Sequence, residues 1–531
     1  MCKKFFTISI DMRLDLSIRI LISLSIALTF LGCSNEIDPY LEEHRPQFHF
    51  SPQGHWMNDP NGLVYYDGEY HLFYQYYPDS TVWGPMHWGH AISTDLIHWE
   101  HLPIALYPDE LGYIFSGSAV IDWNNTSGLA SDQYVHPPMI AIFTHHDPDG
   151  PKNERDDFQV QSIAYSLDKG RTWEKYTDNP VIPNSDIRDF RDPKVIWDEE
   201  RSQWVLVLAA GDRIMFYTSQ NLIDWNLVSE FGQGHGSQGR PWECPDLFPL
   251  SIDDSSVTKW VLIVSQGQEA LNGGSGTQYF VGDWDGKNFT NLNDSTTVLW
   301  LDHGKDNYAG VTWSDVHKDD NRRLFIGWMS NWQYAQQVPT VSWRSAMTLP
   351  RELSLKTFED HVRLISNPVR EARSLRLSTT DLKTGILSTN THLIDKNNQN
   401  NGLFEIEMRM DLNGDSGVEL LLANSKGERV QFGYDVASGR YYIDRTFAGK
   451  SDFSKDYAGV HYSSSENNDV QVIDFKVYVD HSSIEIFAEQ GRVAMTEIFF
   501  PTENFDQLSI SSPQGQVELL EGRIHYLDRI W

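Results

Sequence analysis

Three acidic residues stand in matching surroundings at distant points of the 531-residue chain. Asp59 lies in "NDPNGLV", Asp192 in "RDPKVIW" and Glu243 in "ECPDLF", each close to a proline and to the start of an apolar segment. Two carboxyl groups at one site can serve as nucleophile or base and as proton donor, which is the chemistry of glycoside hydrolysis. A single Asp-Pro would more often cap a turn, so this chemistry requires a fold that brings the three together.

A repeated unit in the first two thirds of the chain indicates such a fold. It is a short apolar segment, a polar turn and a second apolar segment, often followed by a strand-turn-strand element that ends near an aromatic residue such as Trp99, Trp173 or Trp225. Its five copies begin near residues 61, 117, 193, 245 and 308. Five copies predict a five-bladed β-propeller over residues 46–350. A β-sandwich with coincidental hairpins is the alternative, but the repeats agree in order as well as in composition.

The composition and hydrophobic pattern of the sequence change from about residue 373. Tryptophan is nearly absent until Trp531, and segments such as "GLFEIEMRMDL" and "DFKVYVDHSSIEIFA" alternate with period two. This pattern predicts an antiparallel β-sandwich over residues 373–531, with residues 351–372 as a connector. The predicted fold class is therefore all-β, a five-bladed β-propeller followed by a C-terminal β-sandwich.

Propeller geometry predicts that the three acids are partners. The first strand of each blade lines the central channel, so acids in register in blades one, three and four should converge at one end of it. Like charges gathered there raise each other's pKa, which favours a functional site over three independent turn caps. No HExxH, CxxC or histidine cluster at ligand spacing competes with this interpretation. The adjacent His145 and His146 should point to opposite faces of a strand, and no metal or cofactor is expected.

Composition narrows the class of partner. The net charge is −32, from 42 basic and 74 acidic residues, which argues against nucleic acid or an anionic membrane surface and suits a neutral ligand. Some of the 18 tryptophans can act as platforms for the apolar faces of sugars, although most are expected in the core. Three cysteines exclude a disulfide framework, and Cys244, beside Glu243, is interpreted as a small packing residue.

The first 33 residues read as an export signal. Arg13 and Arg19 precede a short apolar run over residues 20–31, which ends at Leu-Gly-Cys. This order is typical of a lipoprotein signal peptide over residues 1–33, with Cys33 lipidated and a linker over 34–45. An ordinary secretory signal is the alternative. In both cases the mature protein is exported, and its contact with a membrane is expected only through a lipid on Cys33.

Four motifs carry a resemblance to a known family. In chain order they are "WMNDPNG" (56–62), "FSGS" (115–118), "FRDPKV" (190–195) and "WECPDLF" (242–248), and the chain resembles glycoside hydrolase family 32, which includes invertases, inulinases and levanases. The resemblance implies hydrolysis of β-fructofuranosidic bonds with retention of configuration. Retention in turn implies that the carboxyl groups of Asp59 and Glu243 lie about 5–5.5 Å apart.

The resemblance also implies a role for each matching residue. Asp59 would be the nucleophile, Glu243 the general acid and then the general base, and Asp192 the stabiliser of the transition state. Contacts to the terminal fructose are implied for Asn58, Gln75, Trp83, Phe115, Ser116, Arg191 and Trp332.

The substrate expected is a fructan or a sucrose-type carbohydrate. Exo-release of fructose from levan (β-2,6) or inulin (β-2,1) is favoured because a propeller channel forms a blind pocket, with sucrose as a further substrate. The alternatives are an endo-levanase or endo-inulinase, an inverting propeller hydrolase of the arabinan type, and a non-catalytic surface fructan-binding lipoprotein. The last is disfavoured because nucleophile and acid are both present. Linkage preference is expected to depend on rim loops such as residues 266–276.

Overall fold

A computed structural model describes residues 39–531, except 132–135, 318, 360, 388–390, 395–400, 415, 465–469 and 514. The chain divides into two compact units, residues 1–42 and residues 43–531. Of the first unit the structure describes residues 39–42, which include the short 3-10 helix η1 (Pro39–Leu41). The expected signal peptide, its Cys33 and linker residues 34–38 lie outside the described residues. In the part of the chain described, no helix is both long enough and apolar enough to cross a membrane.

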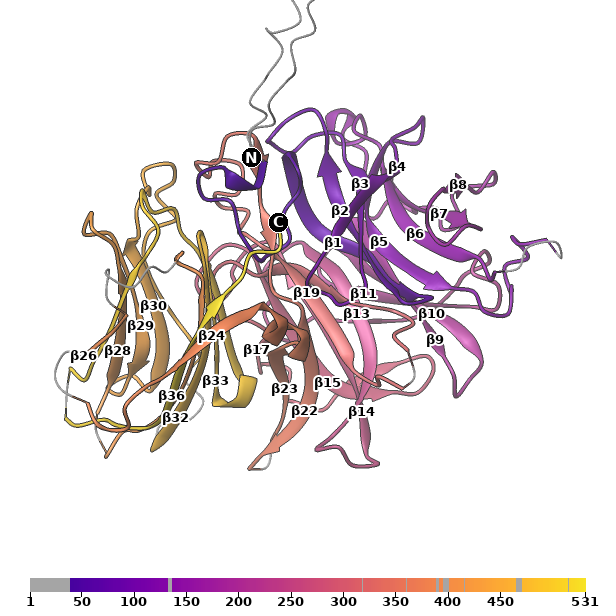
Figure 1. Cartoon of the computed structure of the whole chain (residues 1–531). Coiled ribbons are helices and arrows are strands. Elements are labelled where there is room, and N and C mark those ends of the chain that lie inside the picture. Colours follow the sequence, from indigo (N-terminus) through magenta and orange to yellow (C-terminus); the bar gives the residue numbers. More distant parts are fainter. Residues whose placement is uncertain are drawn as a thin grey trace, which may run out of the picture. The chain divides into compact units, whose positions relative to one another are not determined.

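Five antiparallel sheets follow one another along the second unit (Figure 1). Their inner strands are β1, β5, β9, β13 and β18, and each lies beside the next, with β18 returning to β1. This closed ring of five sheets confirms the predicted five-bladed propeller. The short strand β20 (Trp343–Arg344) pairs in parallel with β1 and ties the end of the propeller to its beginning.

The strands of the blades run outward from the channel in sequence order. Blade one holds β1 (His55–Tyr66), β2 (Glu69–Tyr77), β3 (His87–Ser93) and β4 (Glu100–Leu106). Blade two holds β5 (Tyr113–Ile121), β6 (Met139–His146), β7 (Gln159–Ser166) and β8 (Glu174–Lys175), with η2 (Pro151–Asn153) between β6 and β7. Blade three holds β9 (Phe190–Asp198), β10 (Gln203–Ala210), β11 (Ile214–Ser219) and β12 (Asn226–Phe231). Blade four holds β13 (Trp242–Ser251), β14 (Thr258–Gln266), β15 (Gly276–Trp284), β16 (Phe289–Asn291) and β17 (Leu299–Trp300).

Blade five differs from the expectation at its outer edge. It holds β18 (Tyr308–Thr312), β19 (Arg323–Met329), β22 (Arg351–Phe358) and β23 (His361–Pro368), with β21 (Ala346–Met347) also paired to β19. Residues 351–368, expected within a connector, are thus the two outer strands of the last blade. The long excursion over residues 330–350 separates them from β19, so their pairing is not visible as a local repeat. The link to the next domain is η3 (Arg370–Leu375).

The blades pack through period-two strands buried on both faces. In β10, Leu206 and Leu208 join Ile142 of blade two in one apolar cluster. The alternate residues Val205 and Val207 join apolar residues of blade four in another. Burial of each such side chain contributes about 1.5–3 kcal/mol to folding. Because every blade is held on two sides, the inner strands have little freedom to move, and side chains that face the channel are held firmly.

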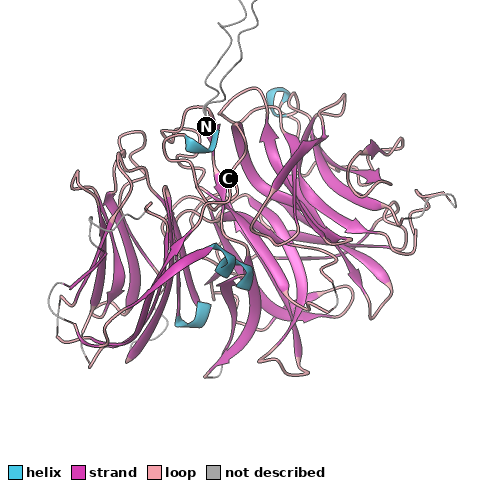
Figure 2. Ribbon diagram, viewed as in Figure 1, coloured by secondary structure: helices cyan, strands magenta, loops and turns pink. Residues whose placement is uncertain are grey.

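Two further sheets form the C-terminal β-sandwich, and Figure 2 shows that strands dominate this region too. One sheet has the order β24 (Arg376–Asp381), β36 (Glu518–Leu527), β27 (Phe404–Asp411), β32 (Val472–Asp480), β33 (Ser483–Ala488) and β34 (Val493–Ile498), with β25 (Gly385–Ile386) on β36 and η4 (Glu489–Gly491) before β34. The other has the order β26 (Thr391–Ile394), β35 (Gln507–Ser511), β28 (Val418–Ala423), β29 (Arg429–Asp435), β30 (Arg440–Phe447) and β31 (Val460–Tyr462). Their facing apolar residues form one core.

Buried charges join the propeller to the sandwich. The Arg351 guanidinium donates to Asp302 Oδ2 at 2.8 Å and to Glu485 Oε2 at 2.6 Å. His49 bridges Asp480 Oδ2 (2.8 Å) and Glu485 Oε1 (2.9 Å) with its two ring nitrogens. Burial alone would lower the pKa of His49, but the two carboxylates outweigh it and raise the pKa to about 9. Such directional contacts specify one docking arrangement, because any other would leave buried charges unpaired.

Candidate active site

All five inner strands depart from a regular ladder at corresponding places. The pairing register shifts between residues 57 and 60 in β1, 114 and 117 in β5, 243 and 246 in β13, and 308 and 311 in β18, while β9 skips residues 192 and 193. The backbone φ is positive at Asp192 (64°), Cys244 (45°) and Ala309 (53°), a region that L residues adopt rarely. A β-bulge redirects side chains and is common beside active sites. The five bulges therefore turn one short stretch of each inner strand toward the same end of the channel.

Asp59 lies in the bulge of β1, where two polar neighbours orient its carboxylate. Asn58 Nδ2 donates to Oδ1 at 3.0 Å, and Ser116 Oγ from blade two donates to Oδ2 at 2.9 Å. Asn58 is itself held by the buried Trp56, whose Nε1 donates to Asn58 Oδ1 at 2.7 Å. Both carboxylate oxygens are thus positioned by side chains, and the group faces the channel in a single orientation.

Asp192 lies in the bulge of β9 and is almost fully buried. Its backbone N–H donates to Thr144 Oγ1 at 3.0 Å, which stabilises the unusual φ. Its Oδ2 accepts a hydrogen bond from the backbone N–H of Cys244 at 3.1 Å. The Cys244 Sγ lies 3.6 Å from Asp192 Oδ2 and 3.6 Å from Asp59 Oδ2, so this thiol is the direct link between the two carboxylates.

Glu243 lies in the bulge of β13 between an arginine and a tyrosine. Arg191 donates to Glu243 Oε1 from Nε at 3.2 Å and from Nη2 at 3.0 Å. The Tyr308 hydroxyl of blade five hydrogen-bonds to Oε2. The same guanidinium lies 3.9 Å from Asp192 Oδ2, so it connects the second and third acids as Cys244 connects the first and second. The three carboxylates predicted to be partners are therefore brought to one site.

Burial and mutual charge change the proton affinities of these groups. Burial first, and then the charge of Glu243, raises the pKa of Asp59 to about 6 against the hydrogen bonds from Asn58 and Ser116. Burial also raises the pKa of Asp192, a shift that Arg191 opposes and the other two acids reinforce. The same factors hold the pKa of the Cys244 thiol well above its ordinary value, so it remains protonated. Carboxyl groups perturbed together in a channel are typical of a catalytic site.

The other residues expected to contact substrate lie around this cluster. Asn58 and Ser116 touch Asp59 as described above. Gln75 of β2 is buried, and its Nε2 has no hydrogen-bond partner among the described residues. Such a donor is costly to bury unless it serves a ligand or water.

Three of the residues expected to contact substrate are aromatic. Trp83 is 36% exposed and meets Phe115 edge-on with ring centroids 6.1 Å apart. Phe115 stacks on His146 at 4.2 Å, and Trp332 stacks on Trp56 at 5.9 Å. Trp83, Phe115 and Trp332 are only partly buried, as a wall that contacts a sugar requires.

Two contacts of the site were not foreseen. Cys244 is more than a packing residue, because its thiol and its N–H both contact catalytic-candidate carboxylates. Tyr308 was not predicted, although it opens the "YAGVTW" segment of the fifth repeat and aligns with Glu243 at the bulge of the neighbouring blade. Repeat register was the signal that could have found it.

The adjacent histidines have separate environments, as expected. His145 Nδ1 lies 2.7 Å from Ser162 Oγ and its Nε2 lies 3.2 Å from Asp109 Oδ1, whereas His146 lies against Phe115. Among the described residues no group of three or more His, Cys, Asp or Glu side chains is arranged to hold a metal ion.

Known proteins are similar to this chain over nearly its whole length. Residues 49–368 match the N-terminal domain of glycosyl hydrolases family 32, and residues 371–526 match the C-terminal domain of the same family. The chain belongs to glycoside hydrolase family 32. It is therefore a glycosidase, and the boundary between the two family domains falls where blade five ends and η3 begins.

Individual relatives of this family 32 member agree with that assignment. A levanase of Bacillus subtilis (strain 168) is 46% identical over 519 residues, which is 97% of this chain and 75% of the relative. The crystal structure of an exo-inulinase from Aspergillus awamori has a TM-score of 0.83 at 37% identity and covers 93% of this chain and 100% of its own. A fructofuranosidase from Schwanniomyces occidentalis complexed with fructose has a TM-score of 0.84 at 34% identity, with the same coverage.

Proposed function

We propose that this family 32 enzyme is a retaining β-fructofuranosidase in which Asp59 is the nucleophile, Glu243 the acid and base, and Asp192 the transition-state stabiliser. The observation that carries the proposal is the linked cluster of three carboxylates, with Cys244 between Asp59 and Asp192 and with Arg191 between Asp192 and Glu243. In the first step the Asp59 carboxylate attacks the anomeric carbon of a fructosyl unit while Glu243 protonates the departing oxygen. In the second step Glu243 takes a proton from water, which displaces Asp59.

The neighbours of each group suit these roles. Asn58 and Ser116 orient Asp59 for attack and favour its charged form, in which it is a nucleophile. The Tyr308 hydroxyl serves Glu243 in both protonation states, because it can donate to the carboxylate or accept from the carboxylic acid. Asp192, buried beside the site, offers an acceptor to sugar hydroxyls and a negative charge to the oxocarbenium-like transition state.

For the substrate we propose a β-fructan from which single fructose units are released, and sucrose as an additional, shorter substrate. The related levanase and exo-inulinases support a fructan, and the bulged channel end supports recognition of a terminal sugar. A time course of size-resolved products from levan, inulin and sucrose tests this. Fructose alone from the first minutes is expected, whereas an early ladder of oligosaccharides would identify an endo-acting enzyme.

The catalytic assignment has its own test. Asp59→Asn and Glu243→Gln are each expected to remove nearly all turnover while leaving the circular dichroism spectrum and thermal melting cooperative. Wild-type-like turnover in either variant would overturn the roles proposed here. Retention is tested separately by following the configuration of newly released fructose by NMR, since inversion would exclude a covalent intermediate on Asp59.

We further propose that the protein is exported and anchored to a bacterial membrane by a lipid on Cys33. The signal-like residues 13–33 support this, and one curated relative is named an extracellular exo-inulinase. Membrane fractionation of cells that produce the full chain and its Cys33→Ser variant tests it. The full chain should follow the membrane fraction, and the variant should lose the lipid and the association; equal distribution of both would support an ordinary secretory signal.

A further inference from the structure

A large cavity opens on the propeller at the end of the channel away from the three carboxylates. Its volume is about 1800 Å³, well above the roughly 300–1,000 Å³ of ordinary ligand pockets. Its lining residues include Tyr65, which is six positions beyond Asp59 on β1, and Trp197, which is five positions beyond Asp192 on β9. Because all inner strands run in the same direction along the channel, these positions lie at the opposite mouth. We call this space the distal cavity.

Buried polar residues close the channel between its two ends. Lys194 Nζ lies 3.2 Å from Asp246 Oδ2 and also donates to the carbonyl of Thr312. Thr312 donates to Asp246 Oδ2 from its N–H at 2.7 Å and from Oγ1 at 2.8 Å. These three residues lie on β9, β13 and β18 just beyond the bulges and are all buried. A ligand in the distal cavity therefore has no route to the catalytic carboxylates along the channel, and the cavity needs an explanation of its own.

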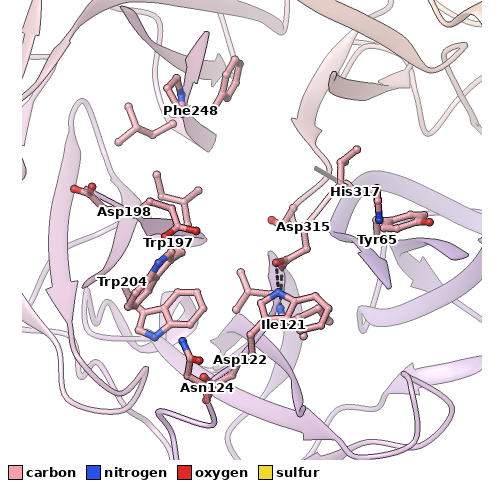
Figure 3. Close-up of a pocket in the computed structure, with 18 of the residues that line it drawn as sticks. Tyr65, Ile121, Asp122, Asn124, Trp197, Asp198, Trp204, Phe248, Asp315 and His317 are labelled. Carbon is pink, nitrogen blue, oxygen red and sulfur yellow. Dashed lines mark hydrogen bonds between the residues drawn. The ribbon is translucent and has the colours of Figure 1, made fainter. Parts of the chain in front are cut away.

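Aromatic rings line the distal cavity. Trp123 lies just beyond β5 and is 59% exposed, an unusual state for the largest apolar side chain. Trp197 and Trp260 also line the cavity and are partly exposed. Figure 3 shows Trp197 and Trp204 on one side of the open space and Asp315 on the other. Flat rings at the mouth of a cavity offer platforms for the apolar C–H faces of sugars, and they contribute most when they are rigid.

Trp123 is held in place by a contact from a different blade. Asp315, beyond β18 of blade five, accepts a hydrogen bond from Trp123 Nε1 at 2.9 Å. It also accepts one from the backbone N–H of Ile121 at 2.9 Å (Figure 3). Burial raises the pKa of Asp315, so keeping this carboxylate here carries an energetic cost. Asp315 fixes the Trp123 ring in one orientation before any ligand binds. A side chain ordered in advance loses less entropy on binding, which can offset the cost of burying the carboxylate.

Polar groups of the cavity favour a neutral, hydroxyl-rich ligand. The indole N–H groups of Trp197 and Trp260 have no acceptor among the described residues and can donate to ligand hydroxyls. Carboxylates outnumber Lys and Arg among the described lining residues, which disfavours an anionic ligand. Several of these carboxylates already have donors, such as Asp198 with Arg201 at 3.2 Å and Asp283 with Lys259 at 2.9 Å, so they do not form a bare site for a cation.

We infer that the distal cavity is a second, non-hydrolytic carbohydrate-binding site that holds a neutral oligosaccharide segment on Trp123, Trp197 and Trp260. The inference rests on the proposed function for the choice of fructan as the first probe and for the expected effect on polymer hydrolysis. Polymer held at this mouth stays near the enzyme while chain ends enter the opposite mouth. The site therefore raises the effective concentration of a polymeric substrate and leaves a short substrate unaffected.

Binding is tested first in a protein that does not consume the polymer. Native electrophoresis of the full chain carrying Asp59→Asn, in gels containing levan, inulin or xylan, measures the apparent dissociation constant. Adding Trp123→Ala and Trp260→Ala should weaken binding of the retained polymer about tenfold, the equivalent of roughly one aromatic contact. Phe447→Ala, which removes a 54% exposed ring from the sandwich, is the matched control and should have no effect. Equal retardation with and without the two tryptophans would overturn the proposal.

Kinetic and crystallographic measurements distinguish loss of polymer binding from misfolding of the variants. With Asp59 intact, Trp123→Ala/Trp260→Ala should raise KM for long polymer about three- to tenfold and leave hydrolysis of short fructo-oligosaccharides unchanged. Trp123→Phe/Trp260→Phe should restore polymer KM, because it keeps the rings. Crystals of the Asp59→Asn protein soaked with a levan oligosaccharide should show sugar on the tryptophans, and an empty cavity at saturating concentration would contradict the proposal. Failure of the catalytic roles would appear separately, as turnover in Asp59→Asn.

Discussion

The two ends of the propeller channel are built from the same five strands and yet have opposite chemistry. At one end each strand is bulged, and acids from three blades are oriented by neighbouring donors. At the other end the pairing within β5, β9 and β13 is regular, and the buried acid Asp315 accepts hydrogen bonds from the Trp123 indole and from the Ile121 N–H. A buried carboxylate is therefore a catalytic candidate here only where a backbone irregularity aims it into the channel and other acids surround it.

Removing one acid at each end should separate the two roles most clearly. Asp59→Asn and Glu243→Gln are expected to lower kcat about 10,000-fold on short fructo-oligosaccharides, because each removes a group that takes part directly in the proposed reaction. Asp315→Asn, at the distal end, should change kcat less than about twofold. Steady-state kinetics of the three purified variants measure this contrast. A comparable loss in Asp315→Asn would show that the two ends are not independent.

Arginines at the two ends give a second comparison. Arg191→Lys keeps the charge but loses the planar fork that contacts Glu243 twice and lies near Asp192, and kcat/KM should fall about 100-fold. Arg323→Lys is the matched change, because Arg323 lies over Phe248 at the distal end, 4.9 Å from the ring centroid. Its kcat/KM should stay within about threefold of the parent. Similar losses would mean that Arg323 supports the catalytic end through the channel.

Stability should change in the direction opposite to activity at the catalytic end. The folded-state pKa of Asp59, about 6, is above its ordinary value of 3.8, so the folded protein binds this proton more tightly than the unfolded chain. The resulting stabilisation is present below about pH 4 and is lost as pH rises to about 6. Asp59→Asn should therefore raise the free energy of unfolding at pH 7 by about 3 kcal/mol and have little effect at pH 4. Chemical denaturation at both pH values measures this, and a variant less stable at pH 7 would contradict it.

The smallest expected effect concerns a single hydrogen bond to Asp59. Ser116 lowers the pKa of this carboxyl by donating to Oδ2, so Ser116→Ala should raise it further. The acidic limb of the kcat/KM profile should then move upward by about 0.5–1 pH unit, with a roughly three- to tenfold loss at pH 5. Thr126→Val removes a hydroxyl that contacts Asp122 at the distal cavity, and it should leave the limb in place. An unshifted limb in Ser116→Ala would assign that limb to another group.

Much of the architecture followed from local pattern. Strand alternation and five repeats predicted the propeller, and the loss of tryptophan with continued alternation predicted the sandwich, because side-chain period depends only on neighbouring residues. The outer strands of blade five were misassigned to a connector because β22 pairs with β19 across 21 intervening residues, 330–350, that belong to neither strand. A strand separated from its partner by such an excursion carries no local sign of where it pairs.

For the site, residue types and motifs were enough to identify the acids Asp59, Asp192 and Glu243, with Arg191 beside the second. How these side chains meet depends on the fold. The bulges, the contact of the Cys244 thiol with two carboxylates and the Tyr308–Glu243 hydrogen bond depend on the pairing of strands from different blades. The distal cavity with its exposed tryptophans also depends on strands from different blades. Residue identity is local, whereas the aim and proton affinity of a side chain depend on groups that chain closure brings from hundreds of residues away.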